Sequence, residues 1–422
     1  MKQLFKKLPS IKTSEQGQAM ILIVFSIIGI IGMSALAIDG GNAYVDSRKA
    51  ETAASAAALA AATTRIEGGD WRAAALATAR DNGYDNNGVS NTVELNTPPI
   101  GEDYGGNPEY IEVIITSHLK TYFGSVIGVP EITNRVAVVS QSKPAILGEL
   151  FDGYALVSLA PKSRCNDHRS FWIHSEATIN LEGGGLFVNS NNPECAFISF
   201  GSGSVRVRDT SPISVVGGAQ VQKPQLITPF PMQTGVTPIS YPPAIQMPKV
   251  GCGSKMAEVD ELNGKITSGN WDEDIFPPEG VTFLGSGVYC IGGDFIVESG
   301  QILHGNNVVL VVDGDIRFNG NAEIHLSSPK SGDHAGLLIY MPIDNHGILA
   351  LNGTSESRFQ GTIFAPGADV RINGLDSGGG AAYHSQIIGY YIEVDGTDNI
   401  YIKYKDEQNY DALKMPEVIL TQ

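Results

Sequence analysis

The sequence predicts an α+β protein in which a long N-terminal helix and a small α+β domain precede a mostly-β region. Residues 19–38 contain no charged side chain, and alanine-rich helical sequence continues from there to residue 65. From residue 151 onwards, apolar segments of about five residues alternate with turns rich in Gly, Asn, Asp and Ser. The 422 residues are enough for two or three domains.

The chain is strongly acidic. It carries 28 Lys and Arg against 45 Asp and Glu, a net charge of −17; residues 1–18 hold four Lys and one Glu, so the remaining residues carry −20. Such a field repels the phosphates of nucleic acids, and no nucleic-acid partner is expected. Hydrophobic residues make up 42% and charged residues 17% of the chain, which excludes intrinsic disorder for its bulk.

The apolar segment at residues 19–38 has the length of a transmembrane helix. At about 1.5 Å per residue it spans roughly 30 Å, the thickness of a hydrocarbon core. Lysines precede it, while Asp39 and Asp46 follow it. The bias of basic residues to the cytoplasmic side then predicts a basic cytoplasmic tail at residues 1–18, a single-pass anchor in the cell membrane, and extracytoplasmic domains after Asp39.

Two other fates of this segment stay open. Ala35-Leu36-Ala37 is a small-x-small site of the kind that signal peptidases cleave. Prepilin-type cleavage after Gly17 is a third fate, although the fifth residue after that point is Leu22 rather than Glu.

Residues 39–148 are predicted to form a stem domain. Alanine favours helix over residues 39–65, and Gly68-Gly69 supplies the stop. The small side chains of this helix admit two interpretations: the helix lies on its own domain, or it packs against copies of itself or related subunits. The other elements expected here are a helix over residues 71–82, capped by Asp70, and strands over residues 110–117 and 132–141.

Motifs around the apolar segment and in the stem share a pattern with one known family. These motifs are Glu15-Gln16-Gly17-Gln18-Ala19, Ile38-Asp39-Gly40-Gly41-Asn42-Ala43-Tyr44, Ala53-Ala54-Ser55-Ala56-Ala57-Ala58-Leu59-Ala60, Asn82-Gly83, and Tyr122-Phe123 with Gly128 and Val136-Ala137-Val138. Over roughly residues 14–143 they resemble the Tad-like domain of TadG-type Flp pilus-assembly proteins, with Ser55 where that family commonly has Asp. The resemblance implies a bitopic envelope protein associated with a thin adhesive pilus, whose partners are other pilus components. The von Willebrand A domain of some members is not expected, because its Asp-x-Ser-x-Ser motif does not occur in this sequence.

The mostly-β region is predicted to be a parallel β-helix, with a β-sandwich as the alternative. Strands recur at short, uneven intervals and end in Asn or Gly, and residues 293–297 echo residues 314–318. Residues 361–373 and 385–396 also resemble the β-helical end domains of Tad-like and type IV pilus-associated proteins. Residues 223–249 hold seven of the 22 prolines, which predicts an extended connector or a strap across one face. This connector divides a first β region, residues 149–222, from a second, residues 250–422.

The four cysteines are predicted to form disulfides, because their number is even and they lie after the membrane segment. The favoured pairs are Cys165 with Cys195 and Cys252 with Cys290, since each pair closes within one β region. A zinc site is the less favoured alternative, because no two cysteines show Cys-x-x-Cys spacing.

An enzyme is the alternative function, because parallel β-helices include polysaccharide lyases and hydrolases that cluster carboxylates, often with calcium, beside an Arg or Lys. The residues that could do this are Asp313 and Asp315 with Arg317, or Asp369 with Arg371. Residues two apart on a strand share a face, but a solvated face of alternating charge gives the same pattern. Four tyrosines are candidates for stacking on sugars or proteins, or else for packing in the core: Tyr383, Tyr390, Tyr391 and Tyr401.

The favoured function is therefore a non-enzymatic envelope protein of the Tad/Flp pilus type, with no cofactor and no metal. It is expected to display its β-helical region for pilus assembly, adhesion, or contact with a surface glycan or protein. The alternative is a membrane-anchored or secreted polysaccharide lyase or hydrolase.

Overall fold

A computed structural model describes residues 16–101, 103–353, 356–374, 382–397 and 399–421. Residues 1–15, most of the predicted cytoplasmic tail, lie outside the described residues. The chain forms two compact units, one of residues 1–145 with 416–422 and one of residues 146–415. We call them the stem and the solenoid.

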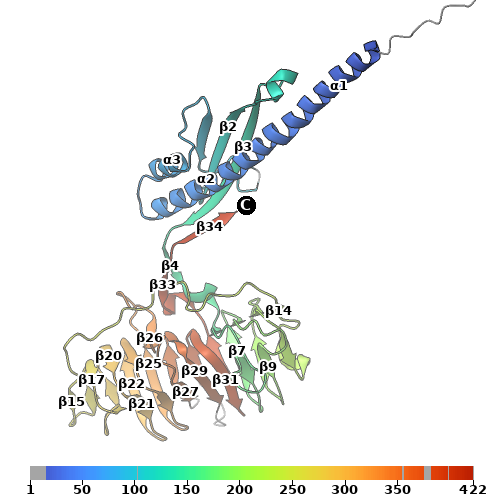
Figure 1. The fold of residues 1–422 in the computed structure, drawn as a ribbon. Helices are drawn as coiled ribbons and strands as arrows, with labels where there is room; N and C mark the ends of the chain where they lie inside the picture. The colour runs from blue at the N-terminus through green and yellow to red at the C-terminus, as the bar shows by residue number, and fades with distance from the viewer. Residues whose placement is uncertain (1–15, 102, 354–355, 375–381, 398, 422) are drawn as a thin grey trace, which may run out of the picture. The chain divides into compact units, whose positions relative to one another are not determined.

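One long helical rod begins the stem (Figure 1). It consists of helix α1 (Gln16–Ser34), a π-helical turn (Ala35–Asp39) and helix α2 (Gly40–Ile66). Within the described chain, this helix from residue 19 to 66 is long and apolar enough to cross a membrane. Its apolar side chains from Met20 to Ile38 are largely exposed, as expected for a segment whose partner is lipid. The rod ends near Gly68, whose positive φ of 76° suits glycine.

The remainder of the stem is a four-stranded antiparallel sheet and a short helix. The strand order is β1-β2-β3-β34. The bounds are α3 Trp71–Asp81, β1 Asn91–Asn96, β2 Tyr110–Lys120, a 3₁₀ turn at Gly124–Ile127, β3 Glu131–Lys143 and β34 Glu417–Thr421. The second β region expected from the sequence ended at residue 422, whereas the structure places β34 at the edge of the stem sheet. The sequence around β34 is ordinary strand sequence, so only pairing reveals where it belongs.

The alanine-rich face of α2 packs on the stem's own sheet and on α3. Ala50, Ala53, Ala57 and Ala61 are fully buried at three- and four-residue spacing, together with their neighbours Ala54 and Ala58. Small side chains let the helix approach the sheet closely enough for the Ser140 hydroxyl to donate to the Ala58 carbonyl at 2.8 Å. Of the two interpretations of this helix, the first describes the alanine face. That face is already covered, so it is not free to pack against another copy.

Residues 146–415 form a parallel β-solenoid of about 10 turns, which confirms the β-helix and rules out the β-sandwich. Inward Val, Ile, Leu and Phe side chains of successive turns stack into one continuous core. The strands before the proline-rich segment are β5 Leu156–Ser158, β6 Phe171–Ile173, β7 Thr178–Glu182, β8 Leu186–Val188, β9 Phe197–Ser199, β10 Ser204–Val207, β11 Ile213–Val215 and β12 Ala219–Val221. Two short strands, β13 Ile227–Thr228 and β14 Gln233–Thr234, lie within that segment.

The strands after the proline-rich segment build the longer half. They are β15 Val259–Asp260, β16 Lys265–Ile266, β17 Gly269–Trp271, β18 Ile275–Phe276, β19 Phe283–Leu284, β20 Gly287–Ile291, β21 Asp294–Val297, β22 Ile302–Asn306, β23 Val308–Val312, β24 Ile316–Phe318, β25 Glu323–Ser327, β26 Leu337–Tyr340, β27 Ile348–Gly353, β28 Arg358–Gln360, β29 Thr362–Gly374, β30 Ala382–His384, β31 Ile387–Gly396 and β32 Asn399–Lys403.

The two halves of the solenoid meet in the middle rather than following one another. One sheet runs in the order β13-β10-β7-β32-β30-β28-β25-β22-β19-β16-β15. The first half therefore grows outward from β7, and the second half starts at the opposite end and grows back until its last turn pairs with the first turn of the chain. In Figure 1 the green and red strands accordingly lie side by side. The pairings that join them are β31 with β5 and β6, and β32 with β7.

The proline-rich segment makes this path possible by carrying the chain back along the solenoid. It covers outward apolar side chains such as Val157, Phe187 and Phe364, as a strap would. Asn189 holds it by donating to the carbonyl of Ile239 and accepting from the N–H of Ile239, each at 2.8 Å. The segment does not lie wholly outside the ladders, however: strands β13 and β14, at its beginning, pair with β10 and β11 as a last partial turn of the first half. The strap is the part that follows, residues 235–249, in which the structure has no strand.

The chain enters and leaves the solenoid at one place. Strands β4 (Ile146–Glu149) and β33 (Asp411–Lys414) pair antiparallel. On the stem side, Lys143 of β3 pairs with Glu417 of β34. The solenoid is thus an insertion between two neighbouring strands of the stem sheet.

Candidate functional site

The helical rod is tied to the stem loop by Asp39, which stands at the end of the apolar segment. Its carboxylate accepts hydrogen bonds from the backbone N–H groups of Tyr122, Phe123 and Gly124 at 2.9, 2.9 and 2.7 Å. These donors open the 3₁₀ turn, where backbone N–H groups have no partner within the turn itself. Gly124 is required for this approach, because a Cβ there would lie 2.8 Å from the Val129 carbonyl oxygen.

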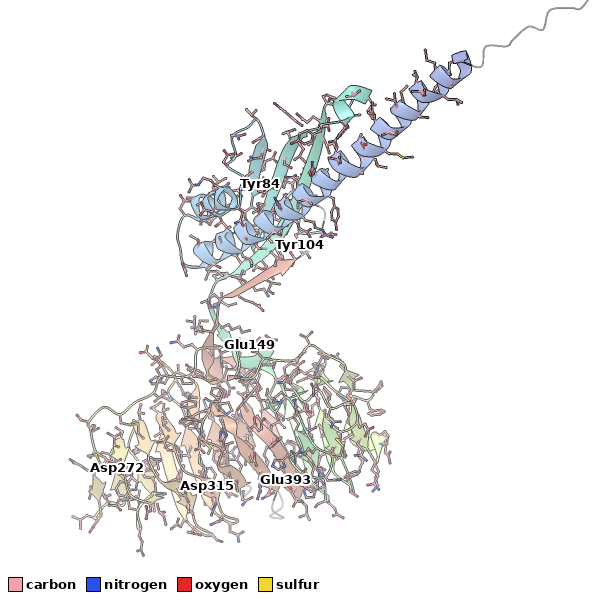
Figure 2. The ribbon with its side chains drawn as sticks, in the orientation of Figure 1. Tyr84, Tyr104, Glu149, Asp272, Asp315 and Glu393 are labelled. Atoms are coloured by element: carbon pink, nitrogen blue, oxygen red, sulfur yellow. A yellow bond between two sulfur atoms is a disulfide. The ribbon has the colours of Figure 1, made fainter. Side chains whose placement is uncertain are left out.

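Asp46, two helical turns later on the same face, makes a second tie. It accepts from the Tyr84 hydroxyl at 3.0 Å, from the Asn134 side-chain amide at 2.8 Å and from the Ser117 hydroxyl. Burial, and then the neighbouring Asp46 carboxylate, raises the pKa of Tyr84, so this hydroxyl stays a donor. Tyr84 is marked on the stem in Figure 2. Together the two aspartates tie the helical rod to the 3₁₀ turn and to strands β2 and β3 of the stem.

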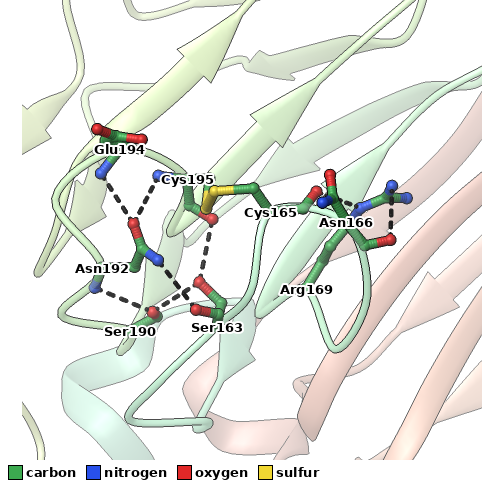
Figure 3. The surroundings of a disulfide bond; sticks show 8 residues. All are labelled: Ser163, Cys165, Asn166, Arg169, Ser190, Asn192, Glu194 and Cys195. Carbon is green, nitrogen blue, oxygen red and sulfur yellow. Dashed lines mark hydrogen bonds between the residues drawn. A yellow bond between two sulfur atoms is a disulfide. The ribbon is translucent and has the colours of Figure 1, made fainter.

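The solenoid holds both disulfides, Cys165–Cys195 and Cys252–Cys290, which are the pairs favoured by the sequence. Figure 3 shows the first pair. It joins the loop before β6 to the turn before β9, and the Ser163 hydroxyl bonds the Cys195 carbonyl at 3.0 Å. Arg169 donates to the carbonyl oxygens of Cys165 and Asn166, at 3.1 and 3.2 Å, which closes the loop on itself.

A cavity of about 270 Å³ lies beside this loop, where the two halves of the solenoid meet. Its walls include Trp172, Tyr391, Asp369 and Arg371. The aromatic rings are already engaged. Arg169 lies 3.6 Å from the ring of Trp172, and the His174 ring stacks on the same indole at 3.8 Å. A sugar could not stack on this tryptophan without displacing one of them. The cavity is lined by residues of both halves, so it marks the place where the two halves of the solenoid pack together.

The acidic candidates from the sequence are held in local interactions. Asp315 pairs with Arg317 at 2.5 Å and accepts from the N–H of Ile348 at 2.9 Å. Burial, and then Asp344, raises the pKa of Asp313. Asp315 and Glu393 are both marked on the solenoid in Figure 2. Across the described residues, no three His, Cys, Asp or Glu side chains gather as metal ligands would.

Asp369 and Arg371 come to the same cavity but do not pair directly. The Arg371 guanidinium instead lies 3.6 Å from Glu393 on the next turn. Burial is the main cause that raises the pKa of Asp369.

Of the four tyrosines, Tyr383 is a core residue with 1% exposure, and Tyr390 contacts Tyr391 and Tyr241. Tyr401 lies under Arg208.

Comparison with known families bears on the helical rod. Residues 17–64 match the family model described as putative Flp pilus-assembly TadE/G-like. This segment is a Tad-like domain. Residues 253–395, most of the second half of the solenoid, match a domain of unknown function, DUF7305.

Two further comparisons add nothing to the argument about function. A search of the curated proteins finds no match. Among solved structures, the competence-associated pilin ComZ from Thermus thermophilus aligns at 12% identity, over 79% of this chain and 84% of that chain, with a TM-score of 0.28. A score of that size carries no argument about fold or function.

The Tad-like domain contains both aspartate ties. From the sequence, Asp39 and Asp46 were interpreted only as negative charges that follow the apolar segment. Their spacing of seven, on the same face as the buried alanines, could have placed both on the packed side of the helix. Their partners in the loop and on β2 and β3 lie about 70 to 90 residues later in the sequence. The periodicity of the helix gives no information about which distant residues those partners are.

Proposed function

We propose that this protein is a non-enzymatic component of a Tad-type pilus system, anchored by its N-terminal helix and displaying the solenoid outside the cytoplasm for surface contact. The observation that carries this proposal is the Tad-like helix that continues unbroken from the apolar segment into the stem. The solenoid is then displayed as an insertion between two adjacent strands of the stem sheet, β3 and β34.

The proposed orientation places the N-terminus in the cytoplasm. It is supported by the lysines that precede the apolar segment and by two disulfides that follow it, because disulfides persist in oxidising compartments. A cysteine-labelling experiment tests it. A cysteine introduced at Ser10 is expected to resist a membrane-impermeant thiol reagent in intact cells, whereas one introduced at Leu262, which is 97% exposed on the solenoid, is expected to react.

The non-enzymatic part of the proposal is supported by the state of the acidic candidates. Asp315 forms an ion pair with Arg317 and accepts a hydrogen bond from a backbone N–H. Arg371 forms its ion pair with Glu393 rather than with Asp369. A lyase needs carboxylates and a base directed toward one substrate atom. Turnover of a polyuronide by the full chain, abolished by Asp315→Ala or Asp369→Ala, would favour the alternative enzyme.

Excision of the solenoid tests the role of display. Because Lys143 and Glu417 are paired neighbours, a short Gly-rich turn can replace residues 146–415 and leave the stem sheet closed. We expect the excised protein to reach the membrane in normal amount while surface attachment of the cells falls. Unchanged attachment at equal membrane levels would overturn the proposed role of the solenoid.

A further inference from the structure

A second cavity, of about 600 Å³, opens on the outer side of the sheet that carries β22, β25, β28 and β30. Its floor is a row of uncharged hydrogen-bonding groups at equivalent positions of four successive turns: Asn306, Ser327, Gln360 and His384. At a strand spacing of about 4.8 Å this row is roughly 14 Å long and runs along the solenoid axis. The row therefore suits a linear ligand better than a single compact one.

Three cations surround this floor. Lys330 follows β25, Arg358 begins β28 and Lys405 follows β32, and all three are exposed. None of them forms an ion pair with a carboxylate among the residues that the structure describes. The described lining contains no Asp or Glu, and Glu407 lines the adjoining hollow instead. In a chain of net charge −17, these three cations make the electrostatic potential at the cavity locally positive.

The positive potential acts on a neighbouring side chain as well. Burial lowers the pKa of His384, and Lys403, Arg358 and Lys405 lower it further, so this imidazole is neutral at pH 7. A neutral imidazole can both donate and accept a hydrogen bond. The Gln408 side-chain oxygen, at the edge of the same cavity, is buried and has no partner within the described chain. The site thus offers donors and acceptors for hydroxyl groups together with cations for a negative charge.

We propose that this cavity binds an acidic polysaccharide through its carboxylate and hydroxyl groups. A neutral glycan would leave the three cations without partners, and a compact anion would leave most of the floor empty. Among the described lining residues the only Phe, Tyr or Trp ring is that of Phe359, which is buried, so the cavity lacks the exposed rings of these types on which nucleic-acid bases stack. The inference deepens the surface contact proposed above and rests on it only for its biological setting.

The test is a binding measurement with the full chain in detergent at 0.15 M salt, using polygalacturonate as the carboxylated probe and dextran as the neutral one. The wild-type protein is expected to bind polygalacturonate and not dextran. The triple variant Lys330→Gln, Arg358→Gln, Lys405→Gln is expected to weaken binding by about tenfold or more. The matched control, Arg206→Gln, Lys255→Gln, Lys265→Gln, removes the same charge at exposed positions elsewhere on the solenoid and is expected to change binding by less than about twofold.

Several results would overturn the proposal: no binding of polygalacturonate, equal binding of dextran, equal loss in the control variant, or tighter binding of single-stranded DNA than of polygalacturonate. A footprint on the wild-type protein covers the case in which the triple variant misfolds. Polygalacturonate is expected to protect Lys330 and Lys405, but not Lys255 and Lys265, from amine acylation. Cysteine labelling and solenoid excision in cells are independent of this test, so failure here leaves the anchoring and display proposal standing.

Discussion

The Asp39 carboxylate at the end of the apolar helix lies 2.7 Å from the backbone nitrogen of Gly124, 85 residues later in the chain. With the N–H groups of Tyr122 and Phe123, this contact joins the membrane segment to the loop between β2 and β3. A single side chain thereby links the end of the apolar segment to a loop that is distant in the sequence.

Asp39→Ala should loosen that joint. The three N–H groups lose their acceptor, so their amide hydrogens should exchange faster by about tenfold or more, while the solenoid stays unchanged. Hydrogen exchange followed by mass spectrometry measures this for the peptide that contains residues 122–124. Asn42→Ala, an exposed change on the same helix, is the control. Equal exchange in Asp39→Ala and wild type would show that the carboxylate does not hold the loop.

Ala57→Leu should destabilise the stem by about 1–3 kcal/mol, because a larger side chain has no space between the helix and the sheet. Ala57 is fully buried in the face that packs on the sheet. Thr52→Leu places the same side chain on an exposed position of the helix and should cost little. Chemical denaturation of the full chain in detergent compares the two. A stable Ala57→Leu protein that gained self-association would instead favour a helix that packs against copies of itself.

Loss of the Cys165–Cys195 disulfide should lower the stability of the solenoid by about 2–5 kcal/mol, since the bond closes a loop of 30 residues. The variant Cys165→Ser, Cys195→Ser should show a lower melting temperature than wild type under oxidising conditions. The difference should disappear when both proteins are reduced. A difference that persists after reduction would assign the effect to the serines rather than to the bond.

Ile392→Ala tests the joint between the two halves of the solenoid. Ile392 of β31 pairs with Phe171 of β6 and is fully buried, so truncation should cost about 2–5 kcal/mol. Ile302→Ala, at a site that is 43% exposed, should cost much less. Urea unfolding followed by circular dichroism gives both values. If the halves were independent, Ile392→Ala would shift only one of two separate transitions.

Asp369→Asn should make the solenoid more stable at pH 7. Burial raises the pKa of Asp369 in the folded protein, so the protonated form is favoured there, and stability is lost as the pH rises through that raised pKa. Asparagine stays neutral and avoids this loss. The advantage of the variant should vanish below about pH 3, where Asp369 is protonated in both states. Melting curves from pH 3 to pH 8 would contradict this if the advantage grew toward low pH.

The sequence alone determined the long apolar helix, its Tad-like character, the repeated short strands and the even set of cysteines. Each of these is a local property: uncharged length, alanine content, strand spacing and residue type are all readable without knowing any distant partner. The choice of β-helix over β-sandwich was also reachable, because the echo between residues 293–297 and 314–318 is a local repeat whose strands do stack in the solenoid.

Tertiary structure alone decided the partners that lie far apart in the chain. It showed that β34 closes the stem sheet, that β31 and β32 dock on the first turn of the solenoid, and that Asp39 and Asp46 are anchors rather than flanking charges. It also brought Lys330, Arg358 and Lys405 to one cavity. The physical reason is the same in each case: strand pairing and charge clustering depend on which segments meet in space, and residue periodicity records only the face that a segment buries.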